Sequence, residues 1–383
     1  MKKRMYVGFM LVVTVLFMGG FFTQKVMAET EGEWEYVISN DAVTITGHTG
    51  VSTVWKIPEK IDGMKVTSIA QSVFKGNVNI EELVIPKYIT TVGNYAFENC
   101  TSLSKITFNA VHCNNMDAHF VFMGCNSINE IIIGKNVKYL PWGAFTETDI
   151  TSVDIPDNVE EIGPYAFSKC DKLENVKLGK NVLIIGERAF SECTVLEDIS
   201  MGEKITTLGP SVFLNCSSLN EIILPSNLVT LKNHMFDGCS SLEKIRYATT
   251  KKFNLNDTFF LNGDTSAILY CVKGSVVDEY AQFFDIDAKY ILKTPSVKLT
   301  GEKESVTVSW KKITGATGYE VYRSTKKNGN YILAAKVKGV KNVTFTDKEI
   351  ENGKKYFYKV VAVNSKDNFL SSGYSTKKSI VVD

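Results

Sequence analysis

Cysteine is the residue of this 383-residue chain whose number and spacing first suggest chemistry. A thiol can form a disulfide, bind a metal or act as a nucleophile. Six of the eight cysteines stand three residues after a phenylalanine, at a nearly regular interval: Cys100, Cys125, Cys170, Cys193, Cys216 and Cys239. This regularity predicts one cysteine per structural repeat, aligned in a column. We therefore expect small, buried, free thiols rather than reactive groups.

Disulfides between neighbouring cysteines of the column are the alternative. Stacked β repeats lie about 5 Å apart, which is within the Cα separation of a disulfide. Parallel side chains in such a stack disfavour the required S–S dihedral angle, so the column is predicted to be mainly reduced. Cys113 and Cys271 lie outside the column, and the sequence identifies no partner for them.

A second group of potential ligands lies in the segment "VHCNNMDAHF", which contains His112, Cys113, Asp117 and His119. Zinc sites usually show paired elements such as C-x-x-C or H-x-x-x-H, and this segment has neither. The better interpretation is an inserted polar loop. The sequence predicts no metal and no cofactor.

Catalytic motifs are absent from the sequence. It contains no nucleophile elbow, P-loop, HExxH motif or nucleotide-binding fingerprint. Adjacent acids such as Glu160 and Glu161 are typical of a solvated face. The formal net charge of +1 gives no basic field for nucleic acid. We therefore expect a protein that is not an enzyme and does not bind nucleic acid.

The residues that precede the cysteines define the repeat. Phenylalanines recur every 22 to 25 residues, at Phe74, Phe97, Phe122, Phe145, Phe167, Phe190, Phe213 and Phe236. Each is followed by a triplet whose first and third residues are apolar, such as "VDI" from Val153, which is the period of a strand with one buried face. A second apolar pair follows in most repeats. Repeats of this kind stack into a solenoid with one continuous core.

The repeat resembles a known family. "SVDIPDNVEEIGPYAFSKCDKL" from Ser152 closely follows the BspA-like, or Treponema pallidum type, leucine-rich repeat, and the segment from Trp34 resembles that family's first segment. The resemblance implies a solenoid over residues 29–292 with terminal caps and clear repeats at about 67–247. It also implies a surface protein that functions in adhesion and ligand binding.

The N-terminal 28 residues have the features of a secretory signal peptide: three cations, a long apolar run, and small residues at Val26 and Ala28. The expected localisation is therefore secreted or cell surface. The apolar run is longer than usual, so an uncleaved signal that anchors the chain in a membrane is the alternative.

From about residue 293 the pattern changes to short alternating strands separated by Gly- and Lys-rich turns, which is typical of a small β-sandwich. Residues 293–383 resemble a fibronectin type III domain. In that resemblance Trp310 takes the position of the core tryptophan and Tyr356 that of the tyrosine corner. The overall prediction is a mainly β chain, a leucine-rich repeat solenoid followed by this sandwich.

The candidate ligand-binding residues are the middle residues of the strand triplets, which should project away from the core: Val84, Thr107, Ile132, Asp154, Lys177, Ser200, Ile223 and Arg246. The candidate structural residues are Phe97, Phe145, Phe167, Phe190, Phe213, Phe236, Trp310 and Tyr356. The favoured function is adhesion to an extracellular host or other-cell protein. The alternative is binding of a carbohydrate or cell-wall polymer, which would be favoured if Tyr95, Trp142 and Tyr165 lined one exposed groove.

Overall fold

The computed structural model describes residues 29–113, 121–228, 231–249, 266–365, 369–372 and 374–382. The expected signal peptide, Asp117 and His119 lie outside these ranges. No helix in the described part of the chain is long and apolar enough to cross a membrane. The chain divides into two compact units, one containing the described residues up to Glu243 and the other the described residues 244–249 and those from Ala267 onwards.

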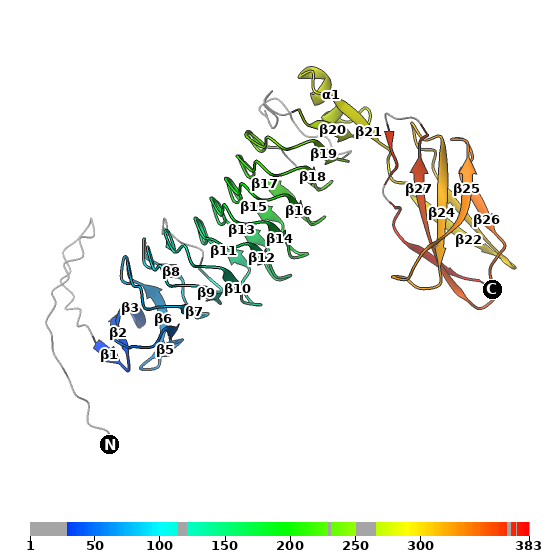
Figure 1. Ribbon diagram of the computed structural model, residues 1–383. Coiled ribbons are helices and arrows are strands. Elements are labelled where there is room, and N and C mark those ends of the chain that lie inside the picture. Colours follow the sequence, from blue (N-terminus) through cyan, green and yellow to red (C-terminus); the bar gives the residue numbers. More distant parts are fainter. Residues whose placement is uncertain are drawn as a thin grey trace. The chain divides into compact units, whose positions relative to one another are not determined.

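The first unit is a solenoid built around two ladders of short parallel strands (Figure 1). We call each repeat a coil and name it by its phenylalanine. The first ladder contains the triplets found in the sequence: β4 (Val54–Lys56), β7 (Glu82–Ile85), β9 (Lys105–Phe108), β10 (Glu130–Ile133), β12 (Ser152–Asp154), β14 (Asn175–Lys177), β16 (Asp198–Ser200) and β18 (Glu221–Ile223). Identical positions pair between coils, so Val153 is opposite Val176, and Val176 is opposite Ile199.

The second ladder is formed by short strands that end at the second residue of the second apolar pair of a repeat, such as Ile162 or Ile185. Its strands are β6 (Met64–Ile69), β8 (Thr91–Val92), β11 (Tyr139–Leu140), β13 (Glu161–Ile162), β15 (Ile184–Ile185) and β17 (Thr207–Leu208). The last residue of each of these strands is buried. The predicted fold class, a mainly β solenoid of short strands, is confirmed.

The corner that carries the phenylalanine has an unusual backbone. Residues two before and two after the phenylalanine have positive φ in successive coils, for example Tyr165 (57°) and Lys169 (59°) around Phe167. This left-handed conformation is uncommon for residues other than glycine, asparagine and aspartate. The two left-handed residues turn the chain sharply on either side of the phenylalanine, and the side chain between them points into the core.

Phenylalanine rings form a continuous stack through the solenoid. Neighbouring rings from Phe145 to Phe236 have centroids 5.5 to 6.0 Å apart and lie within 26° of parallel. All of these side chains are fully buried. Such offset stacking adds to the energy of burying the rings. The stack therefore links each coil to the next one through the core.

An antiparallel sheet precedes the coils. Its strands are β1 (Glu29–Glu31), β2 (Trp34–Ser39), β3 (Ala42–His48) and β5 (Lys60–Ile61), and β6 joins this sheet to the second ladder. His48 packs between Trp34 and Trp55, with ring centroids 4.5 and 4.2 Å away. Phe74 lies 4.9 Å from Trp55, so this aromatic cluster is continuous with the phenylalanine stack.

The second unit begins with the strands β19 (Lys244–Tyr247), β20 (Ile268–Cys271) and β21 (Ala288–Ile291). Helix α1 (Val276–Phe283) lies between β20 and β21, and the Ser275 side chain accepts a hydrogen bond from the Asp278 amide at its start. The short strand β28 (Phe369–Leu370) pairs in parallel with β21.

Two antiparallel sheets complete the second unit. One contains β22 (Val297–Glu302), β23 (Ser305–Trp310) and β26 (Thr344–Asp347), and the other contains β24 (Gly318–Ser324), β25 (Ile332–Lys338), β27 (Lys355–Val363) and β29 (Lys378–Val381). Trp310 and Tyr356 are both buried in one core cluster. The Tyr356 hydroxyl accepts a hydrogen bond from the Glu351 amide (3.2 Å).

Candidate functional site

The first ladder carries the predicted ligand-binding residues on one face. We call it the strand face and define it by the middle residues of β7 to β18. Asp154, Lys177 and Ser200 are exposed, Ile132 is 40% exposed and Ile223 is 59% exposed. Val84 and Thr107 are half-buried. Arg246, on β19 of the second unit, is also half-buried.

The centre of the strand face is polar, and its aliphatic residues lie towards the two ends. Lys177 and Asp154, from adjacent coils, form an ion pair at 3.2 Å, and both side chains are almost fully solvated. Ile132 and Ile223 are separated by the three coils that carry Asp154, Lys177 and Ser200. The face therefore offers two separate apolar contacts on either side of a charged strip.

Lysine and carboxylate pairs join the Phe145 and Phe167 coils at several points. Besides Lys177 and Asp154, the pairs are Lys169 with Glu147, Lys172 with Asp149, Lys180 with Asp157 and Lys138 with Glu160. Exposed pairs of this kind contribute little stability individually. Because each of these lysines is paired with a carboxylate, the surface of this region carries charges of both signs.

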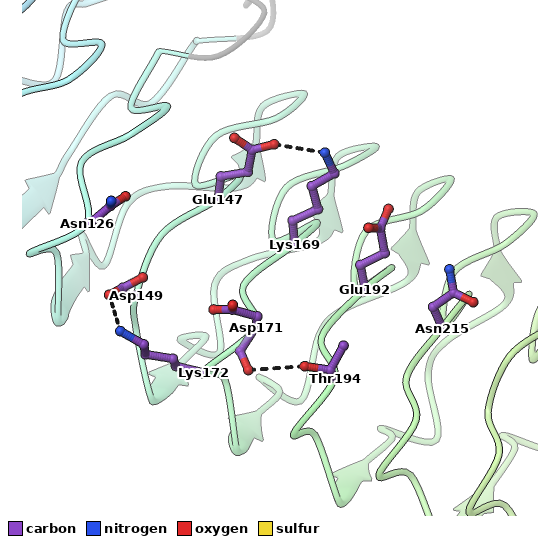
Figure 2. Close-up of a pocket in the computed structure, with 9 residues that line it drawn as sticks. All are labelled: Asn126, Glu147, Asp149, Lys169, Asp171, Lys172, Glu192, Thr194 and Asn215. Atoms are coloured by element: carbon purple, nitrogen blue, oxygen red, sulfur yellow. Dashed lines mark hydrogen bonds and ion pairs between the residues drawn. The ribbon is translucent and has the colours of Figure 1, made fainter.

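An open polar depression follows the phenylalanine corners (Figure 2). Its lining comes from the second and fourth residues after successive phenylalanines, with one lysine beside them: Asn126, Glu147, Asp149, Lys169, Asp171, Lys172, Glu192, Thr194 and Asn215. It contains no histidine, no cysteine and no activated nucleophile. This constellation of carboxylates, ammonium groups and amides can hydrogen-bond a polar partner.

This depression was not predicted from the sequence. The sequence carries one sign of the corner beside the depression. Two positions after the phenylalanine, asparagine or glycine recurs: Asn99, Gly124, Asn215 and Gly238. These residues favour the left-handed conformation that the structure shows at this position in each of these coils.

Two of the three aromatic residues considered for glycan binding lie together. The Trp142 and Tyr165 rings have centroids 5.1 Å apart, and the Arg188 guanidinium lies 5.8 Å from the Tyr165 centroid. These residues come from three consecutive coils, so the Tyr165 ring lies between Trp142 and Arg188. Tyr95 belongs to the Phe97 coil, two coils before Trp142, and its ring has the Lys75 ammonium 5.6 Å away.

The cysteine column has a hydrogen-bonding role. The thiol of each of its six members donates to the carbonyl oxygen of the phenylalanine of the preceding coil, at 3.0 to 3.2 Å. The equivalent position in the Phe145 coil is Thr148, whose hydroxyl donates to the Phe145 carbonyl oxygen at 2.9 Å. Most of these carbonyl groups also accept a backbone amide of their own coil, such as Cys100 N–H to the Phe97 oxygen at 3.2 Å. The thiol therefore adds a second hydrogen bond that links neighbouring coils inside the core.

All eight cysteines are buried. Burial raises the pKa of Cys170 to about 11 and that of Cys239 to about 12, because a thiolate is poorly solvated there. Thiols in this state are poor nucleophiles. Neither Cys113 nor any other described residue belongs to a cluster of three or more side chains that could hold a metal ion. That the column is mainly reduced remains a prediction.

Comparison with known proteins gives partial matches to several proteins. The chain is 39% identical over 72 residues to an amylopullulanase of Thermoanaerobacter thermohydrosulfuricus, which is 19% of this chain and 5% of the enzyme. A solved leucine-rich repeat protein from Bacteroides ovatus ATCC 8483 is 24% identical, with a TM-score of 0.44 over 65% of this chain and 71% of that one. The T. pallidum leucine-rich repeat protein is 22% identical, with a TM-score of 0.30 over 58% and 85%.

A family model matches a larger share of the sequence. The BspA type leucine rich repeat region matches residues 57–163 and 138–265, so that more than half of the chain is covered. These residues contain the phenylalanine corners from Phe74 to Phe236 and the strands from β6 to β19. On this evidence, the chain belongs to the BspA type leucine-rich repeat family.

Proposed function

We propose that this protein is a secreted or cell-surface, non-catalytic adhesin whose strand face binds an extracellular protein of a host or of another cell. The observation that carries the proposal is the strand face itself. Seven consecutive coils from β7 to β18 place their middle residues on it, and five of the seven residues are exposed. Membership of a family that is typically non-enzymatic and surface-located supports the same conclusion.

The mechanism would be recognition distributed along the solenoid. Ile132 and Ile223 would supply apolar contacts, and the ion pair between Asp154 and Lys177 would set the orientation of the partner. Charges at the rim of an interface act mainly on the association rate and on partner choice, whereas buried apolar contacts supply affinity. Residues 1–28 would serve as the signal for export.

The experiment is solid-phase binding of residues 29–383 to immobilised fibronectin, collagen and laminin. For whichever protein is bound, Ile223→Lys should weaken binding by about tenfold, because losing a buried aliphatic contact costs about 1.5 kcal/mol or more. Leu183→Lys is the matched control: Leu183 is 38% exposed, immediately before strand β15 of the second ladder. Equal weakening by both variants would contradict the proposal.

The charge strip can be tested separately. Asp154→Lys and Lys177→Glu each break the ion pair, and combining them restores a pair of inverted polarity. If the partner reads this polarity, the double variant should bind about as weakly as the single variants, with a loss on the order of 1 kcal/mol or less. Recovery of full binding in the double variant would show that the pair acts only within the solenoid.

A further inference from the structure

Charge is distributed very unevenly along the chain. Residues 293–383 contain 18 Lys and Arg residues against 8 Asp and Glu residues, a net charge of +10. Residues 29–292 contain 21 against 34, a net charge of −13. The near-neutrality of the whole sequence therefore conceals a strongly basic C-terminal segment. A field of this sign concentrates anionic partners around that segment.

One face of the sheet formed by β25, β24, β27 and β29 carries aromatic residues. Tyr322 on β24 is opposite Lys359 on β27, and the preceding residue pair, Val321 and Val360, is fully buried. Side chains alternate between the two faces of a strand, and directly opposite residues share a face. Tyr322 and Lys359 therefore lie on the outer face, away from the core of this sheet.

Two tyrosine rings face the ammonium group of Lys359, and a third tyrosine packs against one of them. The Lys359 Nζ atom lies 4.0 Å from the centroid of Tyr331 and 4.7 Å from that of Tyr374. The Tyr374 and Tyr322 centroids are 5.3 Å apart, and Tyr374 is 55% exposed. We call these four residues the tyrosine platform. No carboxylate of the described residues pairs with Lys359, so its positive charge is held only by ring faces.

Polar groups border the tyrosine platform. Glu320 accepts a hydrogen bond from the Tyr322 hydroxyl at 2.7 Å and pairs with Lys336 at 3.3 Å. On the same face, the Lys355 ammonium lies 5.6 Å from the Phe357 centroid. Lys377 donates to the Asn328 side chain at 2.9 Å. The border therefore combines one carboxylate, an amide and several ammonium groups.

We propose that the tyrosine platform binds an anionic polysaccharide, with the exposed Tyr374 ring against the apolar face of a sugar ring. The ammonium group of Lys359 would pair with a carboxylate or phosphate on the glycan, and Glu320 and Asn328 would bind hydroxyl groups. The surface combines the features that binding of an anionic glycan requires: an aromatic ring, the Lys359 ammonium group, neighbouring hydrogen-bonding groups and a net positive charge.

Single-stranded nucleic acid is a less suitable partner for the same surface. Successive bases stack on rings that present compatible planes. The Tyr322 and Tyr374 rings are inclined by 79° to each other, which does not suit two stacked bases. Glu320 can accept hydrogen bonds from sugar hydroxyl groups, which the internal deoxyriboses of DNA lack.

The test measures binding of residues 29–383 to immobilised polygalacturonate, dextran phosphate, dextran and single-stranded DNA. The two anionic glycans distinguish carboxylate from phosphate recognition, and dextran is the neutral control. We expect binding to at least one anionic glycan and not to dextran. Tyr374→Ala and Lys359→Gln should each weaken that binding by about tenfold, the equivalent of about 1.4 kcal/mol, while Tyr374→Phe should retain it.

The matched control is Lys298→Gln. Lys298 is an exposed lysine on β22, in the other sheet, and its substitution removes the same charge from the same basic segment. It should change binding less than about twofold, since one distant charge is screened by salt. Unchanged melting temperatures would show that each variant is folded.

Three outcomes would overturn the proposal. The first is the absence of binding to either anionic glycan. The second is an equal loss in Lys298→Gln and Lys359→Gln, which would mean diffuse attraction without a site. The third is tighter binding to single-stranded DNA that is lost in Tyr374→Ala. None of these outcomes tests the strand face, because Ile223 belongs to the first unit and the tyrosine platform to the second. The Ile223→Lys variant tests the strand face separately.

Discussion

Phe167 lies in the middle of the aromatic stack, with the Phe145 and Phe190 centroids 5.5 and 5.6 Å away. Phe167→Ala should lower the free energy of unfolding by roughly 3–5 kcal/mol, because it empties a large aromatic site in a closed core. Urea denaturation measures this loss. Leu183→Ala, at a partly exposed position of the next coil, is the control and should cost much less. A loss near zero for Phe167→Ala would mean that the stack does not support the solenoid.

His48 makes stability depend on pH. Burial lowers its pKa below the ordinary value of 6.5, and the nearby Glu33 carboxylate opposes this effect. The unfolded chain then binds the proton more readily than the folded chain. Stability contributed by neutral His48 is therefore complete above pH 6.5 and declines as the pH falls through the lowered pKa. The free energy of unfolding of the wild type should fall more steeply than that of His48→Phe as the pH decreases below 6.5, and parallel curves would refute this.

Part of the cysteine column and of the ion pairs between coils could be predicted from the sequence. The interval of the cysteines predicted a buried column, but not the acceptor of each thiol, because the position of the preceding phenylalanine carbonyl depends on the backbone of the corner. The ion pairs between coils were accessible in principle. Lys172, Lys177 and Lys180 each follow their acidic partners by 23 residues, one repeat length.

The elements of the solenoid stack closely because certain glycines allow contact between backbones. A Cβ atom added at Gly186 would lie 2.5 Å from the Pro164 nitrogen and 2.7 Å from the Gly163 carbonyl carbon. At Gly202 the nearest atom, the Gly179 oxygen, would be 3.8 Å away. An added Cβ atom at Gly186 would therefore clash with the neighbouring backbone unless the coils moved apart. The same atom at Gly202 would make an ordinary van der Waals contact.

Gly186→Ala should therefore destabilise the solenoid by about 1–3 kcal/mol, the range for overpacking, and Gly202→Ala should be nearly neutral. Thermal unfolding followed by circular dichroism compares the two variants. If both variants melt at the same temperature as the wild type, the coils tolerate wider spacing than the structure shows.

Both ladders of strands could be predicted from the sequence, the first because its triplets alternate with period two and the second because its apolar pair recurs in register. The phenylalanine corner could not be derived in the same way. Its conformation depends on pairs of left-handed residues, and several of these, such as Tyr165, Lys169 and Arg188, are types that rarely adopt positive φ. The stacked neighbours impose this backbone, so composition alone does not reveal it.

We expect the C-terminal region to fold independently of the solenoid. The core cluster around Trp310 and Tyr356 draws all its residues from positions 292–382. A polypeptide of residues 292–383 should therefore unfold cooperatively by itself, as small domains with their own core do. Differential scanning calorimetry tests this. A fragment without a transition, alongside a cooperative fragment of residues 244–383, would place the boundary at Lys244 instead.

The pairing of β28 with β21 has a consequence for solubility. When a parallel ladder ends on an unpaired strand, the free amide and carbonyl groups of that strand can pair with another chain, which promotes aggregation. Within the described residues, the ladder of β19, β20 and β21 ends beyond β21 on the two-residue strand β28, and very short edge strands are poor templates. Replacing Phe369 and Leu370 by proline should uncover β21, and sedimentation would then show concentration-dependent aggregates. Unchanged sedimentation would mean that the edge is protected in another way. If aggregates form, this two-residue strand is what keeps one copy of the protein from becoming the template for the next.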